Sequence, residues 1–367
     1  MKGLVKYFSI ACVFLLLSGS AYALPSLERM AGEMLLVGFR GMTIDKDSPI
    51  SRDIQQGKVG GVVLFNYDVV LKKYGRNVES PGQLLKLTTD LQGLSSDKLI
   101  ISIDQEGGRV QRLRAENGFK ESMSAQKIGE ESSVLVAKEQ GQLVGEQLYN
   151  FGINVNFAPV VDVNVSPKSP AIGGIERSFS SNPYRVYELA EGFIEGMHSE
   201  NVLSCIKHFP GHGSSTKDSH LGVTDVTSTW SDAELKPYEL LIKNGYADMI
   251  MTAHIFNGNL DADYPATLSP LVINGILRQR YGFDSVVISD DLQMKAIAGQ
   301  FSLREIVRQA LLADVDILLF GNNLEYDPLI ATKVVPIIVD LVNSGEVKKD
   351  KIVKSYLRIQ EIKNRLP

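Results

Sequence analysis

Polar side chains that can do chemistry gather at a few points of this sequence, each at the end of a short apolar run. Four of the five histidines lie in these clusters, and His198 is the exception. Carboxylates, imidazoles and cations placed together can attack, protonate and hold a polar substrate, so the sequence predicts an enzyme. In chain order, the clusters are residues 104–112, 156–162, 207–220, 251–254 and 289–291.

Other kinds of chemistry fit these clusters less well. Histidines and aspartates could bind a metal, but His208 and His212 flank Pro210 and Gly211, which prevent a helix from aligning the two imidazoles. We therefore predict neither a metal nor another cofactor. The chain has no Walker-type phosphate loop and no Gly-x-Ser-x-Gly nucleophile elbow. Acid/base and nucleophilic work by carboxylates and imidazoles remains, and retaining glycoside hydrolysis is one reaction that needs a carboxylate nucleophile and a group that protonates the leaving oxygen.

The apolar runs before the clusters indicate the fold. Eight runs rich in Val, Ile and Leu show little polar alternation, which is typical of parallel strands covered on both faces. Eight β-α units in about 340 residues predict an α/β fold, a single-domain TIM (β/α)8 barrel, in which the polar clusters meet at the carboxyl ends of the strands. A doubly wound open sheet is the alternative, but it gives no reason for eight units. The strands are expected at residues 34–39, 59–65, 99–104, 155–163, 202–208, 248–254, 286–290 and 316–321.

Amphipathic helices are expected between these strands, because apolar residues recur there at spacings of three and four. Ser231 and Glu234 have the spacing of a capping box at the start of one helix. The helices are expected at residues 134–150, 183–200, 231–244, 270–281 and 303–313, with one or two more after residue 328.

The first residues have a different composition from the rest. Lys2 and Lys6 precede an apolar run at residues 8–17, and small residues follow at Ala21 and Ala23. This pattern is typical of a cleavable signal peptide. A membrane anchor is the alternative, but the run is short for a span of about 20 residues. We therefore expect residues 1–23 to be removed near Ala23 and residues 24–367 to form one periplasmic or secreted catalytic domain without a membrane span.

Composition limits the partners. The formal net charge is −5 and no long basic run occurs, which argues against nucleic acid. We expect a monomer. Cys205 would be the one thiol left after signal cleavage, and its apolar surroundings predict a buried structural side chain.

The clusters carry a specific resemblance. Lys207-His-Phe-Pro-Gly-His-Gly213, followed after four residues by Asp218-Ser-His220, resembles in identity and spacing the NagZ-type bacterial β-N-acetylglucosaminidases of glycoside hydrolase family 3. The resemblance covers the chain from about Leu27 to the last expected helix. Further similar segments are residues 104–112, 156–162, 265–269 and 289–294.

The resemblance implies roles for individual residues. Asp290 matches the nucleophile of the family, and His220 matches its acid/base, with Asp218 as the orienting partner. It implies a retaining exo-β-N-acetylhexosaminidase that releases terminal N-acetylglucosamine from muropeptides or chitin-type oligosaccharides through a covalent glycosyl-aspartate intermediate. The residues that match sugar-binding positions are Asp104, Arg112, Arg177, Lys207 and His208.

Alternatives stay open at this point. The chain could be a β-N-acetylglucosaminide phosphorylase or a catalytically silent sugar-binding barrel. Asp291 and His212 are expected to be structural, whereas Asp162 and His254 fit a structural or a pocket role equally. The chain also departs from its relatives after the second strand, where residues 68–80 form a longer segment that bears on the preferred aglycone.

Overall fold

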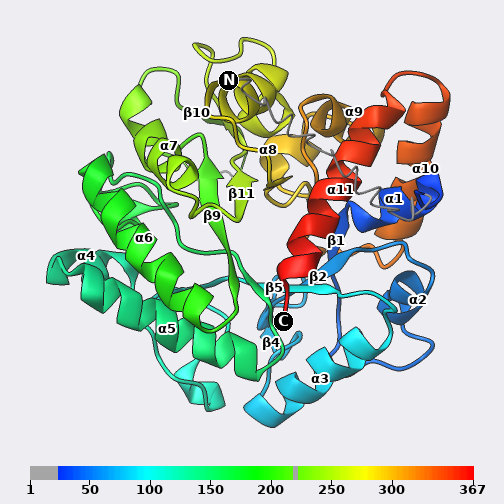
Figure 1. Ribbon diagram of the computed structural model, residues 1–367, viewed down its shortest axis with the longest axis horizontal. Coiled ribbons are helices and arrows are strands. Elements are labelled where there is room, and N and C mark those ends of the chain that lie inside the picture. Colours follow the sequence, from blue (N-terminus) through cyan, green and yellow to red (C-terminus); the bar gives the residue numbers. More distant parts are fainter. Residues whose placement is uncertain (1–23, 218–221) are drawn as a thin grey trace, which may run out of the picture.

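Eight short parallel strands form the centre of the computed structural model, which describes residues 24–217 and 222–367 (Figure 1). Each strand pairs with its neighbour in chain order, and a further bridge between Ile288 and Ile317 joins the last two, so the sheet closes on itself. The predicted TIM barrel is confirmed. The strands are β1 (Leu35–Gly38), β2 (Gly61–Leu64), β5 (Ile100–Ile103), β8 (Val155–Asn156), β9 (Leu203–Phe209), β11 (Met249–Thr252), β13 (Val286–Ile288) and β14 (Leu318–Phe320).

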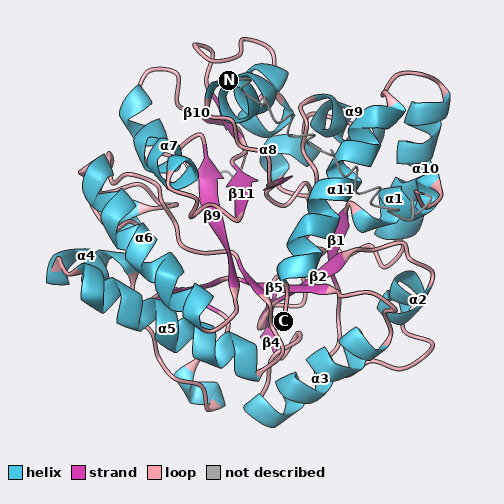
Figure 2. Cartoon of the chain, viewed as in Figure 1, coloured by secondary structure: helices cyan, strands magenta, loops and turns pink. Residues whose placement is uncertain are grey.

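Helices form a ring outside these strands (Figure 2). They cover the outer face of the barrel, and as a result the strand residues are buried on both faces. All the expected helical segments are present, one of them as a π-helix at Leu271–Arg280. The α-helices are α1 (Leu27–Glu33), α2 (Pro49–Gln55), α3 (Pro81–Gly93), α4 (Ala125–Glu131), α5 (Val134–Asn150), α6 (Pro183–Ser199), α7 (Lys236–Lys243), α8 (Lys295–Ala298), α9 (Leu303–Leu312), α10 (Ile330–Asn343) and α11 (Lys349–Arg365).

Two details of the sequence prediction were wrong. The expected strand at residues 155–163 is much shorter, because Pro159 has no N–H to donate; pairing resumes only at the bridge between Val160 and Lys207. The expected capping box is absent, since the Ser231 side chain makes no cap hydrogen bond. Glu234 instead turns inward, where its Oε2 accepts from the Ser214 N–H at 3.2 Å. Burial there raises the pKa of Glu234 to about 7.

Several other sequence expectations can be compared with the fold. Cys205 is buried in β9, as predicted, and burial raises the pKa of its thiol. Within residues 24–217 and 222–367, no helix is both long and apolar enough to cross a membrane. The predicted signal peptide at residues 1–23 lies outside the described residues.

A buried carboxylate holds the seam where the barrel closes. Asp316 precedes β14, and its Oδ2 accepts from the Val287 N–H of β13 at 2.8 Å and from the Arg278 guanidinium of the π-helix. Its Oδ1 accepts from Ser355 Oγ at 2.7 Å and from Arg358 at 3.2 Å, both on α11. One side chain therefore ties two strands and two helices together.

We expect Asp316→Asn to lower the free energy of unfolding by about 3–5 kcal/mol, because it leaves buried guanidinium groups without their counter-charge. Asp284→Asn is the matched control, since Asp284 also pairs with Arg358 but its side chain is 82% exposed. The control should change stability by less than about 1 kcal/mol. Denaturant unfolding of both variants measures the difference, and equal losses would contradict this account of the seam.

Candidate active site

A cavity of about 310 Å³ opens at the carboxyl ends of the strands. Its size is near the lower end of ligand pockets, which suits a molecule as small as one sugar ring. The lining comes from the carboxyl-terminal parts of several strands and from the loops that follow them. It includes every predicted site residue that the structure describes, namely Asp104, Arg112, Arg177, Lys207, His208 and Asp290.

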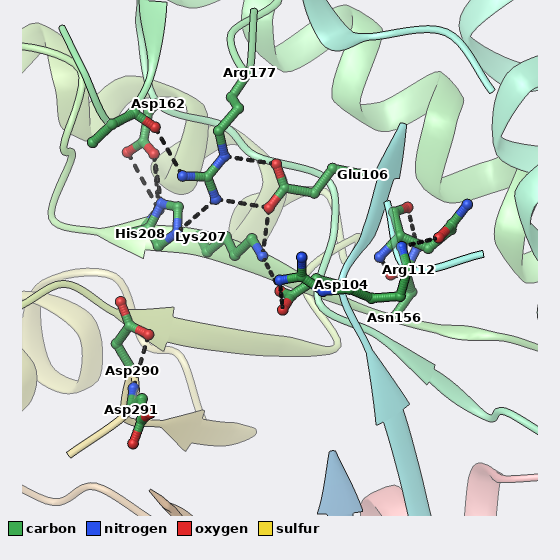
Figure 3. Close-up of polar contacts among 12 residues, drawn as sticks. Asp104, Glu106, Arg112, Asn156, Asp162, Arg177, Lys207, His208, Asp290 and Asp291 are labelled. Carbon is green, nitrogen blue, oxygen red and sulfur yellow. Dashed lines mark hydrogen bonds and ion pairs between the residues drawn. The ribbon is translucent and has the colours of Figure 1, made fainter. Parts of the chain in front are cut away.

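Alternating charges line one wall of the cavity (Figure 3). Lys207 Nζ contacts Asp104 Oδ1 and Glu106 Oε1, both at 2.7 Å. Arg177 makes a two-pronged ion pair with Glu106, with both N···O distances at 2.7 Å. Arg112 contacts Asp104 Oδ2 at 3.0 Å. We call these five side chains the charged wall.

The ionisation of the charged wall follows from these contacts. Burial by itself would raise the pKa of the Asp104 and Glu106 carboxyls, but the adjacent cations outweigh it and the pKa of each is lowered. Likewise, burial would lower the pKa of Lys207, but the two carboxylates raise it. Asp104, Glu106 and Lys207 are therefore charged at neutral pH, and the wall can offer both acceptors and donors to a polar ligand.

Local structure after β5 positions the wall. The Asn156 side chain of β8 binds both backbone groups of Gln105, with its Oδ1 accepting and its Nδ2 donating at 3.0 Å. The chain then reverses at Gly107, whose φ of +94° suits glycine and where a Cβ would lie 2.0 Å from a backbone oxygen. Gln105 Oε1 accepts from the Arg112 N–H at 2.9 Å, and this bond holds the Arg112 side chain close to Asp104.

Asp162, which the sequence left open, lies behind the cavity and does not line it. Its carboxylate accepts from His208 Nδ1 at 2.7 Å and from the His212 N–H at 2.7 Å. His208 Nε2 faces Arg177 at 3.2 Å. Because a guanidinium can only donate, Nε2 accepts and the imidazole proton is on Nδ1. Asp162 thus orients His208 and the start of the loop after β9.

Asp290 follows β13 and lines the cavity apart from the charged wall (Figure 3). The Asp291 N–H donates to Asp290 Oδ1 at 2.8 Å. Asp291 also belongs to the cavity lining, and its Oδ1 accepts from the N–H groups of Gln293 and Gly321 at 3.0 and 2.9 Å. These backbone contacts give Asp291 a structural role in the loop after β13, and both carboxylates belong to the cavity lining.

Two more of the clustered histidines support loops. His254, the second position that the sequence left open, is buried, and its Nε2 donates to the Asp291 backbone oxygen at 2.9 Å. His212 Nδ1 contacts Ser215 Oγ at 2.8 Å. Burial lowers the pKa of His212 to about 4, so this imidazole is neutral at physiological pH. Neither histidine lines the cavity.

Sequence reasoning missed Glu106 as a site residue. The signal was present, because Glu106 is two positions after Asp104 and alternate residues of an extended segment share a face. Asp218 and His220, predicted as orienting residue and acid/base, lie outside the described residues. Within residues 24–217 and 222–367, no group of three or more His, Cys, Asp or Glu side chains could hold a metal ion.

A closed α/β barrel with a small charged cavity at the carboxyl ends of its strands defines a TIM-barrel enzyme that acts on a small polar substrate. Residues 26–362 match the model of the glycosyl hydrolase family 3 N-terminal domain. The chain belongs to glycosyl hydrolase family 3 and is a glycoside hydrolase.

Individual relatives agree with this assignment. A β-hexosaminidase of Tolumonas auensis is 37% identical over 295 residues, which cover 79% of this chain and 83% of the relative. A family 3 β-N-acetylglucosaminidase from Paenibacillus sp. is similar in structure, with a TM-score of 0.85 and 31% identity, but the match covers 93% of this chain and only 63% of that one. A β-N-acetylhexosaminidase from Beutenbergia cavernae gives a TM-score of 0.83 at 28% identity and covers 94% of this chain and all (100%) of the other.

We expect Glu106→Gln to lower kcat/KM for an aryl glycoside substrate by about 10- to 100-fold, because Arg177 and Lys207 lose a shared buried counter-charge and shift. Glu176→Gln is the control, since Glu176 is partly exposed and lies 3.7 Å from Arg109. It should stay within about twofold of the wild type. Steady-state kinetics and melting temperatures test both variants; equal kinetics would show that Glu106 does not shape the wall.

Proposed function

We propose that this chain is an exported, retaining exo-β-N-acetylhexosaminidase that releases terminal β-linked N-acetylglucosamine. Its substrates would be peptidoglycan-derived muropeptides or chitin-type oligosaccharides. The observation that carries the proposal is the cavity itself, which brings the Asp290 carboxylate together with a charged wall that can bind sugar hydroxyls. The β-hexosaminidase names of the relatives support the N-acetylated sugar.

The charged wall suits sugar binding. Asp104 and Arg112 are partly exposed to the cavity, so the carboxylate can accept from hydroxyl groups and the guanidinium can donate to ring substituents. Arg177 and His208 are candidates for the 2-acetamido group, because their relative position is fixed by Glu106 and Asp162. A wall preset by ion pairs costs less to order when the sugar binds.

In the proposed mechanism, an oxygen of Asp290 forms a bond to the anomeric carbon while the bond to the aglycone oxygen breaks. His220 donates a proton to that oxygen. In the second step His220 takes a proton from water, the water oxygen attacks the anomeric carbon, and Asp290 leaves as a carboxylate. Two inversions retain the β configuration. The parts given to His220 and Asp218 rest on the match of residues 207–220 to the family motif.

Export is proposed from residues 1–23, whose basic start, apolar run and small final residues are typical of a signal peptide. An exported enzyme would meet cell-wall turnover products or external chitin fragments rather than cytoplasmic sugars. We propose that it acts there as a monomer.

We expect the wild type to hydrolyse aryl β-N-acetylglucosaminide in preference to aryl β-glucoside, and Asp290→Asn to lower kcat by more than about 10⁴-fold, because an amide cannot form the glycosyl ester. The melting temperature should stay close to the wild-type value. The neighbour Asp291→Asn should lose stability but keep measurable turnover. An active Asp290→Asn variant would refute the assignment of the nucleophile.

We expect His220→Ala to slow hydrolysis of natural disaccharides by roughly 10²–10⁴-fold, because their leaving oxygen needs a proton. An aryl glycoside, whose phenolate leaves without one, should keep its first step and accumulate the intermediate on Asp290. Added azide, which needs no base, should restore the second step. A uniform loss on good and poor leaving groups, without azide rescue, would place the acid/base elsewhere.

A further inference from the structure

The longer segment after the second strand folds as a small hairpin beside the cavity. Its two arms are β3 (Tyr67–Asp68) and β4 (Lys73–Tyr74), which pair antiparallel. The tip, residues 69–72, is exposed to solvent. The hairpin has no role in the proposed mechanism.

A buried ion pair fixes the base of the hairpin. Asp68 contacts Arg76 Nη1 and Arg40 Nε at 2.7 Å each, and its Oδ1 accepts from the Leu71 N–H at 2.8 Å. Burial would raise the pKa of Asp68, but these partners lower it to about 2. Arg76 also donates to the Asn322 backbone oxygen at 2.6 Å. The hairpin is therefore fastened to the loops after β1 and β14.

A second tie makes one arm of the hairpin part of the cavity wall. Asn323 Oδ1 accepts from the Val69 N–H, and its Nδ2 donates to the Tyr67 backbone oxygen, both at 3.1 Å. Tyr67 and Val69 line the cavity beside Asn323. Val69 also remains 42% exposed, so it lies where the cavity opens to solvent.

Exposed apolar side chains continue outward from Val69, next to the exposed Lys72 and Lys73. Val70, Leu71 and Tyr74 are 47%, 49% and 60% exposed. Tyr74 is oriented from both sides, because its ring meets Tyr67 edge-on at 4.9 Å and its hydroxyl accepts from Arg114 at 2.9 Å. The contacts of Asp68 and Asn323 thus hold solvent-exposed apolar side chains at the mouth of a polar cavity. Exposed apolar side chains that are held in place in this way are typical of a binding surface.

We propose that Val69 and Tyr74, supported by Tyr67, form the aglycone subsite, which packs against the apolar C–H face of the sugar ring on the leaving-group side of the scissile bond. This inference rests on the proposed function. The cavity suits one ring, so the second ring of a β-linked N-acetylhexosamine oligosaccharide must emerge at its mouth. The hairpin surface is continuous with the cavity there and offers the apolar contact that a pyranose face requires.

The test compares N,N′-diacetylchitobiose, which fills the subsite, with methyl β-N-acetylglucosaminide, which does not. In Val69→Ser/Tyr74→Ala, the ratio of kcat/KM for chitobiose to that for the methyl glycoside should fall about tenfold, as expected from loss of exposed apolar contacts. The matched control is Val134→Ser/Tyr184→Ala, which changes the same residue types at 42% and 57% exposure on α5 and α6. It should leave the ratio unchanged.

The kcat/KM ratio, the activity of the wild type and the oligomeric state separate the possible outcomes. An unchanged ratio in the hairpin variant overturns the subsite while the proposed function stands. A wild type that hydrolyses neither substrate contradicts the proposed function; the Kd for chitobiose by calorimetry then decides the subsite, and equal values in wild type and variant overturn it. Sedimentation of the wild type and the hairpin variant tests a second occupant. If the wild type forms a concentration-dependent dimer that the variant does not form, and the kcat/KM ratio is the same in both, the tip at residues 69–72 contacts a second copy of this chain instead of a sugar.

Discussion

The buried ammonium group of Lys207 is the constraint on which the site depends. Its side chain is only 2% exposed, and an uncompensated charge in the protein interior costs several kcal/mol. Asp104 and Glu106 supply the compensation, and each then needs a further cation, which Arg112 and Arg177 provide. A ligand cavity lined in this way keeps its charges in fixed positions before any sugar binds.

The same requirement extends behind the cavity. Arg177 also faces His208, which is held by Asp162, and Asp162 in turn holds the backbone of His212 at the start of the loop after β9. Glu234 contacts the same loop at Ser214. The described start of the loop after β9 is therefore held by buried polar contacts that connect it to the charged wall.

The hairpin is held in place in a comparable way. Asp68 neutralises two arginines beneath the hairpin, and Asn323 joins that hairpin to the loop after β14. Polar groups carry the structural role both in the charged wall and under the hairpin, whereas Val69 and Tyr74 are exposed to solvent. In the proposed function, the fixed charges of the wall would bind the sugar hydroxyls. The apolar side chains of the hairpin would contact the aglycone, which must leave after the bond breaks.

The sequence by itself determined the barrel and most of the cavity. Eight apolar runs with helical spacing between them sufficed, because strand burial and helix amphipathicity are local patterns, and strand ends then grouped Asp104, Lys207 and Asp290. Only the tertiary structure decided the parts of Glu106, Asp162 and Glu234. Each is defined by a partner distant in the sequence, as Glu106 is by Arg177 and Glu234 by Ser214. The mistaken capping box at Ser231 shows the reason: local spacing describes which contacts a side chain can make nearby, whereas burial against another loop decides which contact it does make.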